Sequence, residues 1–105
     1  MNQRIEKLKQ NMKNNGIDEL IVTDFYNLKY FVNCTIHTGE RLLALQVSSD
    51  ASPVLYVNAL FFAEESEDYQ VVYYTDDSDP IRKIADRLHG NRIGIDNNGN
   101  SGFLL

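Results

Sequence analysis

Residues 4–35 read RIEKLKQNMKNNGIDELIVTDFYNLKYFVNCT, and the periodicities inside this stretch decide the fold class. Its first part carries apolar side chains on one stripe of a 3.6-residue period: Ile5, Leu8 and Met12. This stripe predicts an amphipathic helix that ends at Gly16, which can take a left-handed conformation. Residues 17–23 predict a strand, because three consecutive apolar residues are typical of a strand covered on both faces. A second short helix is expected over residues 25–31, with Asp24 as its N-cap.

The chain that follows predicts a hairpin and then a further strand. Residues 42–47 and 54–57 are expected to form two strands, because the residues between them, SSDASP, have turn chemistry. A short helix is expected over residues 59–66. Residues 69–75 are rich in β-branched and aromatic side chains, so they predict a fourth strand.

The last helix has the clearest start signal in the sequence. Asp79-Pro80 places a good N-cap directly before a proline at the first helical position. An apolar stripe follows, closed by Gly90, and consists of Ile81, Ile84, Ala85 and Leu88. Residues 92–96 predict one more short strand around Ile-Gly-Ile.

The resulting order of elements is αβαββαβαβ, which predicts an α/β fold. We expect a three-layer sandwich in which helices cover both faces of a mixed sheet of five or six strands. The predicted hairpin makes the sheet mixed, because its two strands must run in opposite directions.

Composition excludes several classes of protein. The chain has 105 residues and a net charge of −5, which argues against nucleic acid as a partner. The sequence contains no apolar run of the roughly 20 residues that a membrane-spanning helix needs, and its N-terminus has no signal-peptide pattern. The single cysteine, Cys34, cannot form an internal disulfide, so we expect a cytoplasmic protein.

Charge is unevenly distributed along the chain. Residues 1–15 carry a net charge of +3, whereas residues 62–80 carry seven acidic and no basic side chains. The favoured interpretation is two solvated faces, and the alternative is an electric field that steers a partner.

The sequence shows no catalytic or metal-binding constellation of its own. The glycines lack the spacing of a phosphate-binding loop, and His37 and His89 fit no metal-ligand pattern. Asp76 and Asp77 follow a predicted strand, as magnesium ligands do in receiver-type domains, but the acidic pair and the lysine that such domains need are absent. We therefore expect neither a catalytic residue nor a metal ligand in this chain, and we expect Asp79 to cap a helix beside solvated neighbours.

The order of segments resembles the N-terminal domain of the creatinase/prolidase family, which includes Xaa-Pro dipeptidases, aminopeptidases P and creatinases. The resemblance covers about residues 3–96 and rests on the order and spacing of several short motifs. These are Gly16-Ile17-Asp18, Thr23, Asn27 with Tyr30, Gly39, Pro53-Val54-Leu55-Tyr56-Val57, and RIGID at 92–96, where Asp96 stands in place of the usual Glu. The resemblance implies a creatinase/prolidase N-terminal domain with a ribonuclease H-like motif.

The resemblance implies that this chain is one part of a longer peptidase. Residues 1–96 would form the N-terminal domain, and residues 97–105 would begin a linker to a missing catalytic domain. That missing domain would hold two divalent metal ions and hydrolyse proline-containing peptides. The implied role of the present chain is non-catalytic: it would pair with its own catalytic domain, contribute to a homodimer and restrict access to the active site.

The resemblance also points to one loop and leaves two alternatives open. His37, Glu40 and Arg41 would line the substrate-access loop, because Arg binds carboxylates through two parallel hydrogen bonds. The competing interpretation pairs Arg41 with a nearby Asp, leaves His37 solvated and has Asn27 bond to local backbone. The parent could also be a creatinase-like amidinohydrolase, or the chain could be a stand-alone α/β binding module.

Overall fold

The computed structural model describes residues 2–39, 41–88 and 92–96, and it has the α/β architecture expected from the sequence. The elements in chain order are α1 (Gln3–Asn14), β1 (Glu19–Val22), α2 (Phe25–Val32), β2 (Ala44–Ser48), β3 (Ala51–Asn58), β4 (Gln70–Tyr74), α3 (Pro80–Asp86) and β5 (Ile93–Ile95). Within these residues, none of the helices is long and apolar enough to cross a bilayer.

The five strands form one mixed sheet in the order β4-β3-β2-β1-β5. β2 pairs antiparallel with both β1 and β3, whereas β1 pairs with β5 and β3 pairs with β4 in parallel. β1, β3, β4 and β5 therefore all run in the same direction. Their carboxyl ends lie at one end of the sheet, and the chain enters β2 at that same end.

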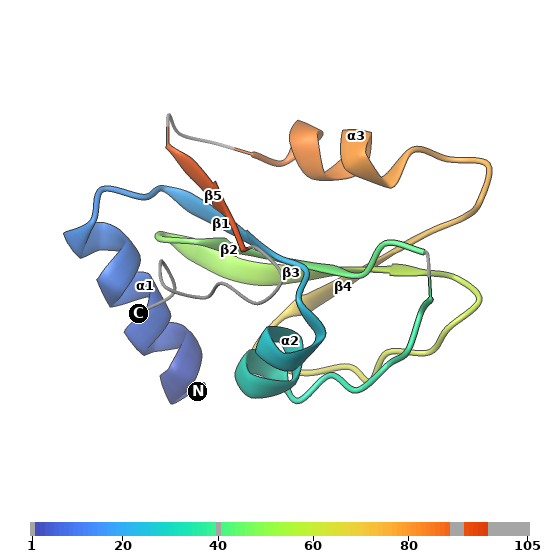
Figure 1. Ribbon diagram of the computed structural model, residues 1–105, viewed down its shortest axis with the longest axis horizontal. Coiled ribbons are helices and arrows are strands. Elements are labelled where there is room, and N and C mark those ends of the chain that lie inside the picture. The colour runs from blue at the N-terminus through green and yellow to red at the C-terminus, as the bar shows by residue number, and fades with distance from the viewer. Residues whose placement is uncertain (1, 40, 89–91, 97–105) are drawn as a thin grey trace.

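Helices cover both faces of the sheet, as Figure 1 shows with α1 and α2 below the strands and α3 above them. The larger core lies on the α1 and α2 side and contains Leu20 and Val22 of β1 together with Leu45 of β2. A smaller core on the α3 side contains Ile21 of β1 and Ile84 of α3. All four residues of β1 are buried, which confirms the prediction of a strand covered on both faces.

The α3 side of the sheet also holds a buried polar layer. The Glu19 carboxylate accepts hydrogen bonds from Gln46 Nε2 at 2.9 Å and from the Ser48 hydroxyl. The Gln46 Oε1 atom accepts from the Tyr56 hydroxyl at 2.6 Å, and its Nε2 atom also donates to the Arg87 carbonyl at 3.1 Å. Burial raises the pKa of Tyr56. These contacts connect β1, β2, β3 and the end of α3 on one face.

Local capping signals in the sequence predict the helix starts correctly. The Asp24 side chain accepts from two backbone N–H groups in the first turn of α2. The Asp79 side chain does the same for α3, and Pro80 occupies its first turn. After α1, Gly16 has φ = +69°, a left-handed value that side chains disfavour and glycine adopts readily.

The expected helix over residues 59–66 is wrong. Irregular chain connects β3 to β4, and side chains bind its backbone: Asn58 Oδ1 accepts from Leu60 N–H at 2.9 Å, and the Tyr73 hydroxyl accepts from Ala63 N–H at 3.3 Å. A helix here would also have ended in a cluster of acidic side chains, which its negative C-terminal pole disfavours.

Two other expectations needed correction in detail. The predicted turn at 48–53 is tighter, because β3 already begins at Ala51 and carries a bulge at Ser52 and Pro53, where proline has no N–H to donate to β2. The last helix was expected to continue to Gly90, but α3 ends at Asp86, and the apolar stripe on it is only partly buried.

The partial burial of α3 follows from where it touches the sheet. Ile84 is buried and Leu88 packs beside it, but Ile81 is 62% exposed because the helix contacts the sheet through its second half. The predicted end of the helix at Gly90, and His89 with it, lie outside the described residues.

Leu45 tests the larger core. Its side chain is fully buried between the sheet and the two helices, so Leu45→Ala should lower the free energy of unfolding by about 2–5 kcal/mol. Leu60→Ala is the matched control, because Leu60 is 68% exposed and its truncation should cost less than about 0.5 kcal/mol. Urea unfolding followed by circular dichroism measures both. Equal stability of the two variants would contradict this description of the core.

Candidate functional site

The carboxyl ends of four strands bring several polar side chains to one end of the sheet. Thr23 and Asp24 follow β1, Asp96 follows β5, and Asn58 ends β3. Asp76 comes two residues after β4. In open α/β sheets, ligands bind at the carboxyl ends of the strands, so this end is the natural place to look for a site.

Asp96 organises one half of this end. Its Oδ1 atom accepts from Thr23 N–H at 2.8 Å and from the Thr23 hydroxyl at 3.0 Å. Its Oδ2 atom accepts from Asp24 N–H at 2.9 Å and from Asn27 Nδ2 at 3.1 Å. The carboxylate is buried and fixes the end of β5 to the first turn of α2.

Asn27 therefore has a different role from the one expected. The alternative for it was a hydrogen bond to nearby backbone, but its side chain bonds to a carboxylate 69 residues away in the sequence. Together, Asn27 and Asp96 hold the start of α2, which forms one wall of the candidate site.

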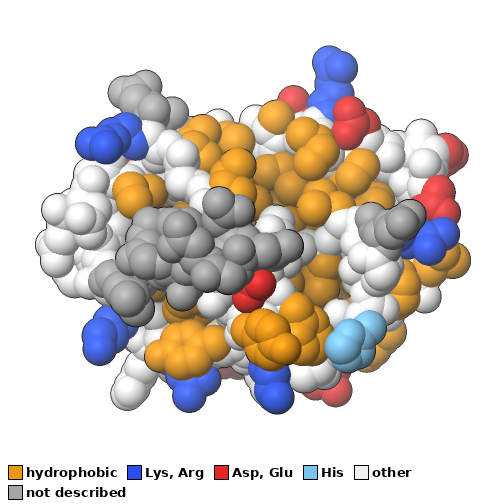
Figure 2. Space-filling model, viewed as in Figure 1, with side chains coloured by type: hydrophobic (Ala, Val, Ile, Leu, Met, Phe, Trp, Pro, Cys, Tyr) orange, Lys and Arg blue, Asp and Glu red, His pale blue; other side chains and the backbone are white. Residues whose placement is uncertain are grey.

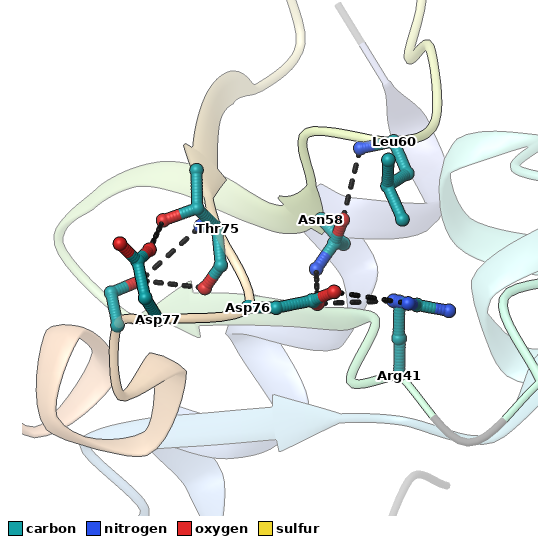
Figure 3. Close-up of polar contacts among 7 residues, drawn as sticks. Arg41, Asn58, Leu60, Thr75, Asp76 and Asp77 are labelled. Carbon is teal, nitrogen blue, oxygen red and sulfur yellow. Dashed lines mark hydrogen bonds and ion pairs between the residues drawn. The ribbon is translucent and has the colours of Figure 1, made fainter.

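Arg41 organises the other half. Its Nε and Nη2 atoms donate to the two carboxylate oxygens of Asp76 at 3.1 and 3.0 Å, as Figure 3 shows. Asn58 Nδ2 donates to the same carboxylate at 2.7 Å. Asp76 is thus ion-paired, which corrects the expectation that it is merely solvated and agrees with the alternative that pairs Arg41 with a nearby Asp.

The ion pair leaves part of the guanidinium group open. Asp76 occupies the side formed by Nε and Nη2, whereas the Nη1 atom and the outward hydrogen of Nη2 form a second edge with the same two-donor geometry. In Figure 3 one terminal nitrogen of the Arg41 guanidinium group points away from Asp76. The side chain remains 43% exposed.

Arg41 and Asp76 shift each other's pKa in opposite directions. The hydrogen bonds from Arg41, and then that from Asn58, lower the pKa of the Asp76 carboxyl group. The same hydrogen bond and the charge of Asp76 raise the pKa of Arg41, so the guanidinium group stays protonated.

His37 lies at the surface of the loop between α2 and β2, which also carries Arg41. Its ring stacks on that of Phe25, the first residue of α2, with 4.6 Å between ring centroids and 20° between ring planes. The His37 side chain is exposed, and Figure 2 shows histidine colour at the surface beside hydrophobic side chains. The expectation of a solvated histidine is correct for its exposed side, while the stacking fixes the orientation of the ring.

A cleft of about 540 Å³ lies between this loop and the start of α2. Its apolar surface comes from Phe25, Leu28, Ile36, Leu42 and Leu43, and its polar lining includes Thr23, His37, Thr38 and Arg41. Two hydrogen bonds close a turn in this loop. Arg41 N–H donates to the Thr38 carbonyl, and the Thr38 hydroxyl donates to the Arg41 carbonyl. The cleft thus combines an apolar wall with one fixed cation.

The structure brings together two of the three residues expected in the substrate-access loop. His37 and Arg41 line one cleft, and Glu40 lies outside the described residues. Among the residues that are described, no group of three or more His, Cys, Asp or Glu side chains could hold a metal ion.

Asp76 as the partner of Arg41, and Asn58 as the second donor to Asp76, were not identified from the sequence. The usable signal was the parallel pairing of β3 and β4, because the carboxyl ends of parallel neighbours meet and each of these residues lies at or just beyond one of those ends. Both strands are evident in the sequence, but their pairing is not.

Comparison with known proteins places this geometry in a family. The family model described as the Creatinase/Prolidase N-terminal domain matches residues 4–102. The chain belongs to the creatinase/prolidase N-terminal domain family. This confirms the resemblance inferred from the order of its sequence motifs.

Individual relatives agree with the family. The chain is 32% identical over 87 residues to an Xaa-Pro dipeptidase of Lactobacillus delbrueckii subsp. lactis and 30% identical over 88 residues to one of Lactobacillus helveticus. In both comparisons the match covers 80% of this chain and 24% of the relative. The chain therefore spans about a quarter of the length of these curated relatives.

A solved structure agrees as well. The creatinase/prolidase N-terminal domain of an X-Pro dipeptidase from Streptococcus pyogenes superposes with a TM-score of 0.80 at 26% identity, over 94% of this chain and 79% of that one. The sheet and helices described above are thus those of a creatinase/prolidase N-terminal domain.

The Asp96 contacts predict a measurable loss of stability. Asp96→Asn keeps the shape of the side chain but replaces one acceptor with an NH₂ group, which then faces a backbone N–H that has lost its partner. We expect the free energy of unfolding to fall by about 1–3 kcal/mol. Asp50→Asn, in the exposed β2–β3 turn, should change it by less than about 0.5 kcal/mol. Wild-type stability of Asp96→Asn in urea titrations would refute this role.

The Arg41–Asp76 pair predicts a titration shift. NMR titration should show an Asp76 pKa below the usual value of about 3.9. Arg41→Ala should raise this pKa only part of the way back, because the Asn58 hydrogen bond remains. Since the folded-state pKa is lowered, the pair stabilises the fold above pH ~4 and loses that effect as pH falls through the lowered pKa. Asp50 is the internal control, and an unchanged Asp76 pKa in Arg41→Ala would contradict the pairing.

Proposed function

We propose that this chain is the non-catalytic N-terminal domain of an Xaa-Pro dipeptidase-like peptidase and that its cleft controls access to the active site. The family assignment and the names of its relatives support the peptidase, and they favour it over a creatinase-like amidinohydrolase or a stand-alone module. The proposed partners are the protein's own catalytic domain, a second subunit in a homodimer, and proline-containing peptides.

One observation carries the proposed role of the cleft. Asp76 holds the Arg41 guanidinium group at the rim and leaves its second two-donor edge open. A dipeptide substrate has a free terminal carboxylate, which this edge matches with two parallel hydrogen bonds. The apolar wall of the cleft, including Phe25, suits the proline ring.

His37 would add a weaker contribution to carboxylate binding. Its imidazole lines the same cleft as Arg41 and can donate one N–H hydrogen bond to a carboxylate. Glu40 belongs to the same proposed loop.

The proposed chemistry itself resides elsewhere in the longer protein. Two divalent metal ions are expected in its catalytic domain, where they would activate water and polarise the scissile carbonyl group. The described residues offer no cluster that fits such ions, so we assign no catalytic step to this chain. We also propose a cytoplasmic location, which is supported by the free and buried thiol of Cys34.

Steady-state kinetics of the full-length protein test the role of Arg41. Arg41→Ala should raise KM for Ala-Pro roughly 10- to 100-fold, because a charge-assisted contact to the substrate is lost. The change in kcat should be smaller, since a contact made equally in the ground and transition states affects binding alone. His37→Ala should raise KM less, because the imidazole offers a single hydrogen bond in place of two parallel ones.

Two controls separate carboxylate binding from a general effect. Ala-Pro amide lacks the terminal carboxylate, so its KM should not respond to Arg41→Ala. Arg82→Ala removes an exposed arginine of α3, on the other face of the sheet, and should leave KM for Ala-Pro unchanged. An equal increase for the acid and the amide, or no increase for either, would refute carboxylate recognition by Arg41.

A further inference from the structure

The outer edge of β4 presents backbone groups that lack partners within the described part of the chain. β4 forms one edge of the sheet, with β3 as its neighbour (Figure 1). The Tyr74 carbonyl faces β3, where it accepts from Ala59 N–H at 2.8 Å. Because successive residues of a strand direct their backbone groups to opposite sides, those of Val71 and Tyr73 face outward. No described residue hydrogen-bonds to these outward groups.

A groove runs beside this free edge. It has a volume of about 800 Å³ and is lined on one side by Tyr69, Val71 and Tyr73 and on the other by residues 62–66. The Tyr69 hydroxyl donates to the Glu64 carbonyl at 3.0 Å, and Tyr73 bonds to Ala63, so two β4-side tyrosines hold the opposite wall in place. The groove shares no lining residue with the Arg41 cleft.

The groove offers an apolar anchor point. Phe62 lies at its rim with 76% of its surface exposed, and Tyr73 is 43% exposed beside it. A sheet binds an additional extended segment through the unpaired backbone groups of its edge strand and through side-chain contacts beside that edge. This groove offers both.

Charge decides between the possible occupants. Glu64 and Glu65 line the groove and are exposed, as is Glu67 beyond it, and residues 62–80 contain no basic side chain. Neither of the ion pairs among the described residues involves these acids. A second copy paired edge to edge would bring its own acids against them, whereas a basic segment would be attracted.

We propose that the β4 edge and its groove are a docking site for an extended peptide segment that carries Lys or Arg. The segment adds a strand to the sheet through the backbone of Val71 and Tyr73. Its apolar side chains contact Phe62 and Tyr73, and its basic side chains meet Glu64 and Glu65. This site is separate from the cleft of the proposed function and does not depend on it.

Fluorescence anisotropy with two labelled heptapeptides tests the charge preference. The peptide KVKFKVK alternates basic with apolar side chains, and EVEFEVE has the same pattern with acids. The basic peptide should bind at least roughly 10-fold more tightly, and its affinity should fall as salt is added. Equal affinities, or no binding of the basic peptide up to about 1 mM, would overturn the proposal.

Hydrogen exchange tests strand addition. Saturating KVKFKVK should slow exchange of the Val71 and Tyr73 amides at least roughly 10-fold. Binding without this protection would mean electrostatic attraction alone and would overturn the proposal. Protection of both amides in the free protein, with a dimer in sedimentation velocity, would also overturn it, because a second copy would then occupy the edge.

A matched pair of charge reversals assigns binding to the groove. Glu64→Lys/Glu65→Lys should weaken KVKFKVK binding roughly 10-fold. Asp50→Lys/Asp86→Lys changes the net charge by the same amount at exposed positions outside the groove and should weaken it less than about 3-fold. All four positions are exposed, so both variants should fold. Equal weakening in both variants would show that net charge, and not this groove, attracts the peptide.

Discussion

One buried carboxylate connects the parts on which the rest of this domain depends. Asp96 accepts four hydrogen bonds from Thr23, Asp24 and Asn27, and its own N–H donates to the Ile21 carbonyl at 3.0 Å. A buried charge needs such compensation, because transfer from water costs several kcal/mol when its hydrogen bonds are not replaced. The end of β5, the end of β1 and the first turn of α2 are thereby held together, and α2 supplies one wall of the cleft.

The two carboxylates at this end of the sheet, those of Asp96 and Asp76, differ in burial and in the charge of their hydrogen-bond donors. Asp96 is buried and accepts from four neutral donors, so it fixes the chain segments around it in place. Asp76 lies at the surface, where it orients Arg41 without using all of the guanidinium donors. An exposed pair contributes little to stability, because water and salt screen its attraction. Its consequence is the direction in which Arg41 points, which bears on the proposed carboxylate binding more than on folding.

Local signals predicted the starts of α2 and α3 and the end of α1, and non-local pairings were the main gap. Asp24, Asp79-Pro80 and Gly16 act on backbone within a few residues, so a short window of sequence contains the relevant physics. Asp76 and Arg41 are 35 residues apart, and they meet only because β2 pairs antiparallel with β3 while β3 pairs in parallel with β4. The expected helix at 59–66 failed for a related reason: tyrosine side chains from the β4 side bind this backbone, and that competition is invisible in local periodicity. His37 and Arg41 are close in the sequence, but the cleft that they line exists only in the folded chain.

The pairing of β1 with β5 has a consequence for synthesis of the chain. Leu20 pairs with Val47 in β2, but its other neighbour is Gly94, 74 residues further along. During translation the hairpin of β2 and β3 can close early, since its contacts are local, and β1 can join it. The outer edge of β1 then stays unpaired until β5 leaves the ribosome. For that interval the nascent domain exposes an apolar strand, Leu-Ile-Val, of the kind that pairs with other chains, and β5 ends this exposure.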